Sequence, residues 1–261
     1  MKIAVLIKQV PVSNQVTVNP ETHALVRSSS EAMVNPADLN AIEAALQLKE
    51  AVGGSIVVFT MGPPNAEEAL REAMARGCDE GCLITDRCFA GGDTIATAKV
   101  LTRSIEKWGG FDLILGGAQS SDGATGQVGA MVAELLSIPH VAEIQNLSVD
   151  AEKRNGIVQK KCGDKIFTIE CQLPALFTIN FGINEPRLST LRSKRASKSK
   201  PLTVHNNEIL GFQASEVGLM GSPTEVVDSF EPQISRKAEM LFGNGKDLMP
   251  KLKELIAKRG E

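Results

Sequence analysis

Residues 116–129 (GGAQSSDGATGQVG) carry the clearest sign of binding chemistry in the sequence. Five glycines in this run would let the backbone approach a ligand closely. Amide groups at an expected helix start near residues 126–128 would carry partial positive charge, which favours a phosphate group. A run of this kind can also serve only to turn the chain tightly, and residue spacing alone leaves both readings open. No Walker lysine follows and no GxGxxG is present, so we do not expect P-loop ATP hydrolysis.

A second run, residues 86–97 (DRCFAGGDTIAT), places Asp93 and Thr94 at an expected helix start. Residue types alone favour helix capping, which needs no ligand. The alternative is a hydrogen bond from these side chains to a ribose or ribityl hydroxyl.

Other reactive residues form no recognisable site. His23, His140 and His205 stand in unrelated contexts, so we expect no Ser–His–acid triad. The five cysteines include no CxxC pair, and we expect neither a metal site nor a disulfide. We therefore predict no catalytic residues and no metal ligands.

Composition excludes further classes of function. The net charge of the 261 residues is only −3, and the chain has no tyrosine and one tryptophan. A general nucleic-acid binder would carry more positive charge and more aromatic platforms, so we expect no nucleic-acid partner. No apolar run reaches the roughly 18–20 residues that span a bilayer. We expect no membrane span and a cytoplasmic location.

The elements that would position these runs alternate between strand and helix. Apolar segments typical of buried strands occur at residues 3–7, 55–60, 81–85 and 111–115, and patterns with helical spacing lie between them. One helix is expected over residues 36–51, and another after Asn65, which could cap it with Glu68. Such alternation predicts an α/β fold with a doubly wound, mainly parallel, Rossmann-like sheet. Ligands of such sheets bind beyond the carboxyl ends of the strands, where residues 8–11, 61–64, 86–97 and 116–129 would meet.

The second half of the chain shows a different pattern of polar and apolar residues. Alternating polar and apolar residues predict short antiparallel strands at 147–149, 156–160 and 165–169, and residues 175–180 are expected to return to the main sheet. The basic, serine-rich residues 192–201 predict a mobile, solvated loop. Residues 202–235 show no usable periodicity, and a last helix is expected over 247–258.

Several short motifs follow one another in a fixed order along the chain. They are Lys8-Gln9-Val10-Pro11; Asn35-Pro36 before Glu43-Ala44-Ala45; Met61-Gly62-Pro63; Asp122-Gly123 with Gly126-Gln127; and Leu173-Pro174-Ala175 followed by Asn184-Glu185-Pro186-Arg187. No single motif is very specific, but the ordered set is. On these motifs the sequence resembles the electron transfer flavoprotein beta subunits over about residues 1–195, with a looser continuation to the end.

This resemblance implies an adenine nucleotide alpha hydrolase-like fold and a heterodimer with a larger alpha subunit that carries one FAD. Ordinary members of the family hold AMP in the beta subunit as a structural ligand. Electron-bifurcating members hold a second FAD there, which accepts hydride from NADH. Because residues 86–97 resemble the bifurcating pattern, we favour FAD over AMP.

The resemblance also implies site residues by their position in the motifs. The implied cofactor-binding residues are Leu6, Asn35, Met61, Asp93, Thr94, Thr97, Asp122, Gly123, Thr125, Gly126, Gln127 and Val128. The family's partner-recognition loop matches residues 186–200, with Leu191 as the apolar anchor that enters a flavin-dependent dehydrogenase such as an acyl-CoA dehydrogenase. Ferredoxin or flavodoxin would be the other electron acceptor of a bifurcating member.

Together with the residue patterns, the resemblance implies three parts of the chain. They are a nucleotide-binding α/β domain over residues 1–190, a recognition loop and extended arm over 191–235, and a helix over 236–261 that packs on the alpha subunit. Three functions stay open: a flavin-binding electron carrier, an interaction subunit that holds AMP while its partner does the redox work, and a nucleotide-binding stress-type protein. The protein alone is better described as an electron carrier than as a conventional enzyme.

Overall fold

The computed structural model describes residues 1–12, 17–18, 25–26, 32–228 and 240–257. Residues 229–235 of the expected arm therefore lie outside the described residues. The chain divides into two units, Met1–Val226 and Val227–Glu261.

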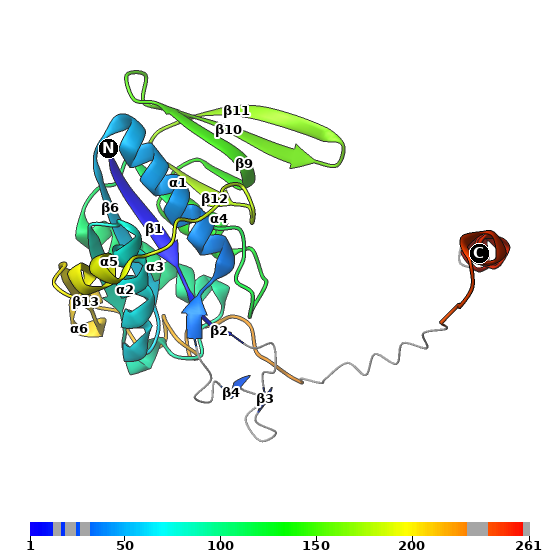
Figure 1. Ribbon diagram of the computed structural model, residues 1–261. Coiled ribbons are helices and arrows are strands. Elements are labelled where there is room, and N and C mark those ends of the chain that lie inside the picture. The colour runs from blue at the N-terminus through cyan, green and yellow to red at the C-terminus, as the bar shows by residue number, and fades with distance from the viewer. Residues whose placement is uncertain (13–16, 19–24, 27–31, 229–239, 258–261) are drawn as a thin grey trace. The chain divides into compact units, whose positions relative to one another are not determined.

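One mixed sheet of nine strands organises the first unit (Figure 1). Its strand order is β11-β10-β9-β12-β8-β1-β6-β7-β13, and every neighbouring pair from β9 to β13 is parallel. The strands are β1 (Lys2–Ile7), β6 (Ser55–Met61), β7 (Glu80–Ile84), β8 (Leu113–Gly117), β9 (His140–Asp150), β10 (Asn155–Cys162), β11 (Lys165–Gln172), β12 (Ala175–Ile179) and β13 (Leu202–His205). The expected α/β class with a mainly parallel sheet is confirmed.

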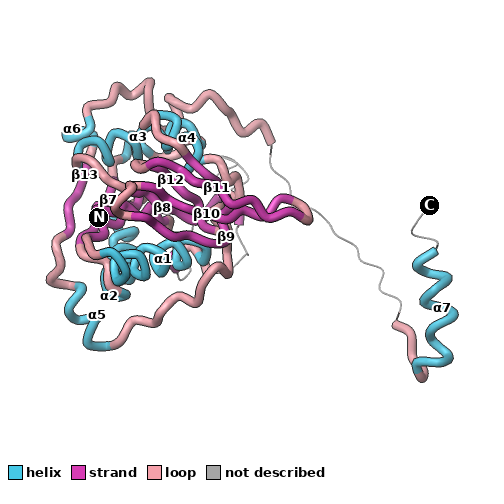
Figure 2. Tube along the Cα trace, turned by 90° about the horizontal axis from the view of Figure 1, so that it is seen from above, coloured by secondary structure: helices cyan, strands magenta, loops and turns pink. Residues whose placement is uncertain are grey.

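Helices cover both faces of this sheet (Figure 2). The long helices are α1 (Pro36–Val52), α2 (Glu67–Arg76), α3 (Thr94–Trp108) and α4 (Val128–Leu135). Alternate residues of β1 point to opposite faces, as in any strand. Ile3, Val5 and Ile7 pack in the core beneath α1 and α2, whereas Ala4 and Leu6 pack in the core beneath α3 and α4. Because both faces are buried, the central strands read as unbroken apolar runs.

The first helices begin and end largely where the sequence predicts. Pro36 opens α1, and Gly53 and Gly77 follow the ends of α1 and α2 with positive φ. The expected Asn65–Glu68 capping box is wrong, however. Residues Pro64–Ala66 form a short 3-10 turn, η1, which runs directly into α2, so Asn65 lies inside the turn and caps nothing. A proline at that turn fixes the backbone in a helical φ one residue early.

The expected antiparallel strands are present and longer than the sequence indicated. Strands β9, β10 and β11 form a meander at the edge of the main sheet beside β12. Val158 is fully buried, while Ile166 and Phe167 at the outer edge are exposed. Short pairs also form between β2 (Gln9–Pro11) and β5 (Ala32–Val34), and between β3 (Thr17–Val18) and β4 (Leu25–Val26).

Residues 187–205 correct two expectations. The expected mobile loop at 192–201 contains a short helix, α5 (Leu191–Ser197), which begins with a capping box between Thr190 and Ser193. Arg71 donates to the carbonyls of Ser197 and Lys200, so the segment is fastened to α2. The next residues form β13, which pairs with β7 although its sequence showed no usable pattern. Its four residues are too few for a periodic signal, and the edge of an existing sheet decides their conformation.

The second unit contains α7 (Gly245–Ala257), close to the helix expected at 247–258. Its side chains are not buried, and Pro250 lies in its interior. A further short helix, α6 (Asn207–Leu210), follows β13 in the first unit. Among the described helices, none combines the length and apolar character needed to cross a membrane.

A buried histidine makes stability depend on pH. His205 is buried, with Nδ1 2.8 Å from the hydroxyl of Ser104, and burial followed by the nearby Lys107 lowers its pKa below the ordinary 6.5. The unfolded chain therefore binds a proton more readily than the folded one, so this contribution to stability is present above about pH 6.5 and is lost as the pH falls below that.

Urea unfolding at several pH values tests this contribution. Between pH 7.5 and 5.5 we expect the free energy of unfolding of the wild type to fall relative to that of the H205N variant, which lacks the histidine's contribution to the pH slope. H140N, at an exposed position, is the matched control and should keep it. A wild-type slope in H205N would contradict the assignment.

Candidate functional site

A cavity of about 1180 Å³ lies at the carboxyl ends of the parallel strands. The chain runs from β1 outward to β6 and β7, then crosses to β8 on the other side of β1, so strand order reverses between β1 and β8. Such a switch point leaves a crevice where ligands bind in open α/β sheets. The end residues of β1, β6, β7 and β8 all line the cavity.

A buried carboxylate fixes the floor of the cavity. Asp38, in the first turn of α1, accepts hydrogen bonds from the backbone amides of Lys8 at 2.7 Å and Gly117 at 3.0 Å, and from the side chain of Asn35 at 3.0 Å. Burial raises its pKa to about 7, against the lowering effect of these donors. The carboxylate thus ties the ends of β1 and β8 to the start of α1.

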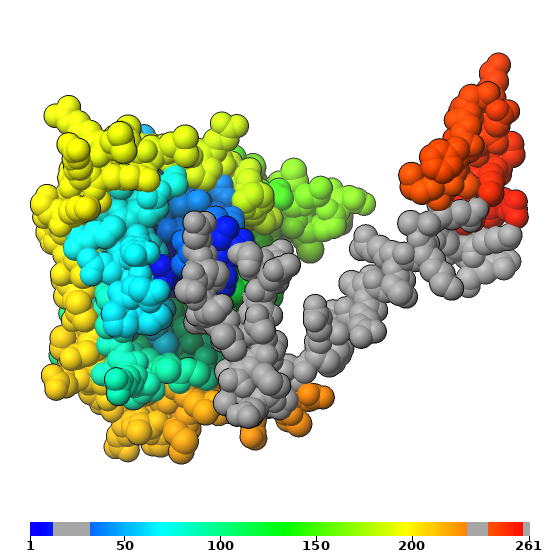
Figure 3. All heavy atoms as spheres, turned by 60° about the horizontal axis from the view of Figure 1, so that its bottom comes forward, coloured from blue at the N-terminus to red at the C-terminus, as the bar shows by residue number. Residues whose placement is uncertain are grey.

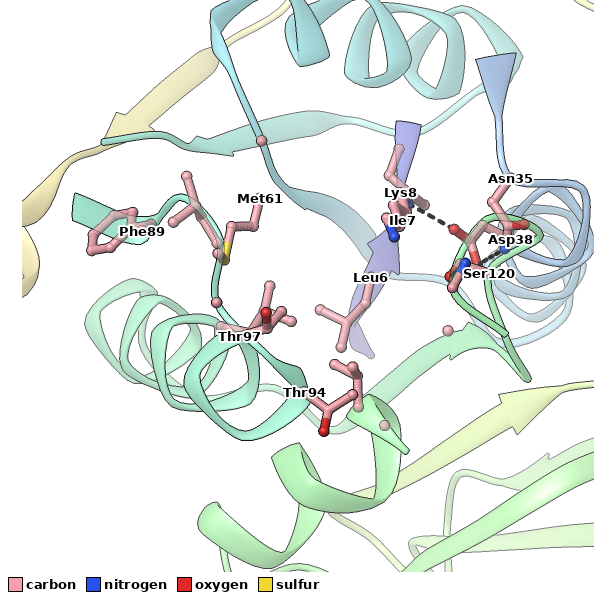
Figure 4. A pocket seen from close by; sticks show the side chains of 18 of the residues that line it. Leu6, Ile7, Lys8, Asn35, Asp38, Met61, Phe89, Thr94, Thr97 and Ser120 are labelled. Atoms are coloured by element: carbon pink, nitrogen blue, oxygen red, sulfur yellow. Dashed lines mark hydrogen bonds between the residues drawn. The ribbon is translucent and has the colours of Figure 1, made fainter. Parts of the chain in front are cut away.

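Asn35 extends this arrangement to the glycine-rich loop. Its side chain accepts from the amide of Ser121 and donates to the carbonyl of Gln119. Figure 4 shows Asn35, Asp38 and Ser120 together at one end of the cavity. The loop is therefore held both by Asn35, the residue before α1, and by its own turn, in which the amide of Ala124 donates to the carbonyl of Ser120 at 2.8 Å.

Lys8 brings a cation to the same end of the cavity. Its ammonium lies 2.7 Å from the carboxylate of Asp122, whose side chain is 5% exposed. Lys8 lines the cavity, but Asp122 does not. Asp122 thus differs from the other implied cofactor-binding residues, because its side chain lies behind the wall and orients Lys8.

Two helices begin side by side at the cavity. Asp93 caps α3 by accepting from the amides of Ile95 and Ala96, which confirms the capping role that residue types favoured. Helix α4 starts at Val128, after Gly126 with φ +63°. A hydrogen bond of 3.1 Å from Thr94 to Gln127 joins the two helix starts. The amides at the start of α4 have no side-chain cap, and with the partial positive charge of that helix end they make this wall suitable for a phosphate group. The first amides of α3 are already bonded to Asp93.

The remaining wall is largely apolar. Figure 4 shows Met61, Phe89 and Thr97 facing the same space as Leu6. Phe89 is held edge-to-face against Phe212, with ring centroids 6.4 Å apart. A cavity with one apolar end and one polar, amide-lined end fits a ligand with a flat ring system and a charged tail.

Most implied cofactor-binding residues meet in this one cavity. Those that line it are Leu6, Asn35, Met61, Asp93, Thr94, Thr97, Gly123, Thr125, Gly126, Gln127 and Val128. Sequence reasoning missed Asp38, Thr178, Val204 and Asn206. Asp38 could have been found from the sequence, as an acid close to Asn35-Pro36 in an otherwise apolar helix face. The residues of β12 and β13 could not, because only the order of strands in the sheet brings their ends to the cavity.

Leu191 lies elsewhere on the first unit, at the start of α5. Its side chain is 84% exposed and that of nearby Leu188 is 86% exposed. Arg192, Lys194 and Arg195 follow within the same short helix. Unlike the expected mobile loop, this surface is fixed from below, since Arg187 pairs with Glu43 at 2.8 Å and Glu50 at 2.6 Å.

The cysteines and acids suggest no other chemistry. Burial raises the pKa of Cys78 and Cys82 to about 12, so neither thiol is poised to react. Within the described part of the chain, no group of three or more His, Cys, Asp or Glu side chains could hold a metal ion.

Comparison with known proteins agrees with this geometry. The electron transfer flavoprotein domain matches residues 22–210. The electron transfer flavoprotein subunit beta of Thermoanaerobacterium thermosaccharolyticum is 41% identical, and the alignment covers 99% of each chain. Subunit CarD of the caffeyl-CoA reductase–Etf complex of Acetobacterium woodii is 39% identical over 97% of this chain and 98% of its own. Protein FixA of Azotobacter vinelandii is 38% identical over 95% of this chain and 90% of its own. The chain therefore belongs to the family of electron transfer flavoprotein beta subunits and FixA proteins.

Proposed function

We propose that this chain is the beta subunit of an electron-bifurcating electron transfer flavoprotein and that it binds FAD in the cavity at the strand ends. Electrons would pass from NADH to this FAD, and from there both to the FAD of an alpha subunit, which serves a dehydrogenase, and to a low-potential acceptor such as ferredoxin or flavodoxin. The observation that carries the proposal is the cavity itself, with two helix starts on one wall and apolar side chains on another.

The size of the cavity favours FAD over AMP. At about 1180 Å³ it exceeds the roughly 300–1,000 Å³ usual for a drug-sized ligand. AMP would occupy only the polar end, near Asn35 and Gly126, and would leave the apolar end near Met61 and Phe89 without a ligand. A dinucleotide with a flat redox ring uses both ends.

The polar end would hold the pyrophosphate and adenosine. The amides before α4 can donate to phosphate oxygens, and Lys8 adds a positive charge held in place by Asp122. The side-chain amide of Asn35 is already hydrogen-bonded to the loop at Gln119 and Ser121. Its contribution is therefore to hold the loop in place.

The apolar end would receive the isoalloxazine ring. FAD, when bound, supplies hydride acceptance and one-electron transfer. The chain's own residues exclude water around the ring and fix its plane, chiefly Met61, Phe89 and Leu101. Thr94 and Thr97 offer hydroxyl groups at the boundary between the two ends, where a ribityl chain would lie.

The names of the relatives support the electron-bifurcating type. The name of CarD places that protein in a caffeyl-CoA reductase–Etf complex, and another relative, 40% identical over 99% of this chain, is named an acryloyl-CoA reductase electron transfer subunit gamma. We infer by analogy that this chain pairs with an alpha subunit in the cytoplasm and serves a flavin-dependent dehydrogenase or reductase. Leu191, exposed on a fixed basic surface, would be its apolar anchor for that partner.

The nucleotide content of the purified two-chain complex tests the proposal. We expect two FAD per complex, and reduction of one of them by NADH in the absence of a dehydrogenase. One FAD with one AMP would support the alternative, a beta subunit with a structural nucleotide. A colourless complex without adenylate would sink both.

Gly126 supplies a sharper test of the amide-lined wall. Its φ of +63° is unfavourable for alanine, so G126A should shift the amides before α4 and weaken FAD binding by about tenfold, as expected for one lost charge-assisted hydrogen bond. G163A is the matched control, because Gly163 has φ +60° with open space around it, in the β10–β11 turn. Equal dissociation constants for both variants, measured by flavin fluorescence, would contradict this wall as the phosphate site.

Truncation of Leu191 tests the partner surface. L191A should lower the rate of electron transfer to the dehydrogenase by about tenfold or more, as expected for a central anchor, while leaving NADH oxidation with an artificial acceptor unchanged. I166A, a similarly exposed side chain on β11, is the control and should leave both rates unchanged. Loss of both activities in L191A would indicate a folding defect instead.

A further inference from the structure

The segment of residues 217–224 lies against the loop that forms one wall of the cavity, and we call it the 217–224 strap. It follows Phe212 in the sequence and precedes the second unit. Val217, 1% exposed, anchors it in the core beneath α3 and α4. In Figure 3 the orange surface of this part of the chain lies beside the teal surface of residues near 90.

Asp93 makes the main contact between the 217–224 strap and the cavity wall. One carboxylate oxygen, Oδ1, caps α3, and the other, Oδ2, accepts from the hydroxyl of Thr224 at 2.8 Å and from its amide at 3.3 Å. Burial raises the pKa of Asp93, but the hydrogen bonds from Ala96, Thr224 and Ile95 outweigh burial and hold it below its ordinary value. The Asp93 carboxylate therefore carries a full negative charge at neutral pH, which strengthens each of its hydrogen bonds.

Two further contacts hold the strap at the turn before Asp93. The amide of Asp93 donates to the hydroxyl of Ser222 at 2.8 Å, and that hydroxyl donates to the carbonyl of Gly218 at 2.7 Å. The amide of Leu219 donates to the carbonyl of Ala90 at 3.1 Å. The strap thus binds backbone groups at both ends of this turn, the carbonyl of Ala90 and the amide of Asp93.

The fit of the two backbones is close. Gly218 has φ +59°, and a Cβ there would lie 2.0 Å from the carbonyl oxygen of Cys88. On the opposite side, Gly92 approaches the Cα of Gly218, which a Cβ on Gly92 would meet at 3.4 Å. The glycine at position 218 therefore allows a contact that a side chain there would prevent.

The strap acts on residues that line the cavity. Ala90, Gly91, Gly92 and Asp93 belong to the wall, and Thr94, one residue on, joins α3 to α4 through Gln127. A change in the strap would alter the turn, then the start of α3, and through Thr94 the start of α4. The wall is therefore not held by its own loop alone.

We propose that Thr224 and Ser222 are positioning residues for the cofactor, and that the 217–224 strap couples the chain leading to the C-terminal unit to the cavity wall. A displaced strap would free Asp93 Oδ2 and loosen the two helix starts. The choice of FAD as the ligand rests on the proposed function; the coupling of strap to wall does not.

Thr224→Val in the full chain, purified with its partner subunit, tests the coupling. Without the hydroxyl, hydrogen exchange at the amides of Leu219, Asp93 and residues 94–97 should rise by about tenfold, and the FAD dissociation constant should rise by a similar factor. Exchange in the strands β1 and β8 should stay unchanged. Thr224→Ser keeps the donor and should behave as wild type, and Thr168→Val, at an exposed position on β11, is the matched control.

The outcomes separate this proposal from the proposed function. Faster exchange together with weaker FAD binding supports the coupling. Unchanged exchange at residues 94–97 overturns it, and so does faster exchange with an unchanged FAD dissociation constant. If the wild-type complex binds no FAD, the proposed function fails, and the exchange at residues 94–97 alone then decides for or against the coupling.

Discussion

The buried carboxylate of Asp38 is the interaction on which the ligand cleft depends. It accepts from the ends of two neighbouring parallel strands and from Asn35, so the strands and α1 keep one relative position. There is no room for a side chain on Gly117, where a Cβ would lie 2.2 Å from Asp38 Oδ1 and 2.9 Å from the backbone of Ala37. Removal of one partner from such a set leaves buried donors unsatisfied, which costs roughly 1–3 kcal/mol for each group. The cleft is therefore built before any ligand arrives.

A preformed cleft suits a cofactor that stays bound through many electron transfers. Its walls come from elements far apart in the sequence, and each wall is held by a carboxylate that is bonded to other parts of the chain: Asp38 for the floor, Asp122 for Lys8, and Asp93 for the start of α3. All three are carboxylates that accept from backbone amides or a lysine. Charge-assisted bonds of this kind are short and directional, which is what a fixed wall requires.

The surface around Leu191 is built differently from the cavity. Its apolar side chain is exposed, but the chain beneath it is fastened by Arg187 to Glu43 and Glu50, and by Lys200 to the last carbonyls of α2. The two carboxylates raise the pKa of Arg187, so its charge is permanent. For the partner proposed above, a backbone that is fixed in advance would lower the entropy lost on binding, and the exposed basic side chains near Leu191 would steer an acidic surface.

The sequence by itself determined the α/β class, the order of the first strands and helices, and the loops that carry ligand chemistry, because buried strands and glycine-rich helix starts leave strong local patterns. The capping role of Asp93 was predictable for the same reason. Tertiary structure alone decided that β13 joins the sheet, that residues 191–197 form a fastened helix, and that Asp122 lies behind the cavity wall. Those outcomes depend on β7, Arg71 and Lys8, which come from distant parts of the chain. A local pattern cannot record a contact whose energy comes from a partner a hundred residues away.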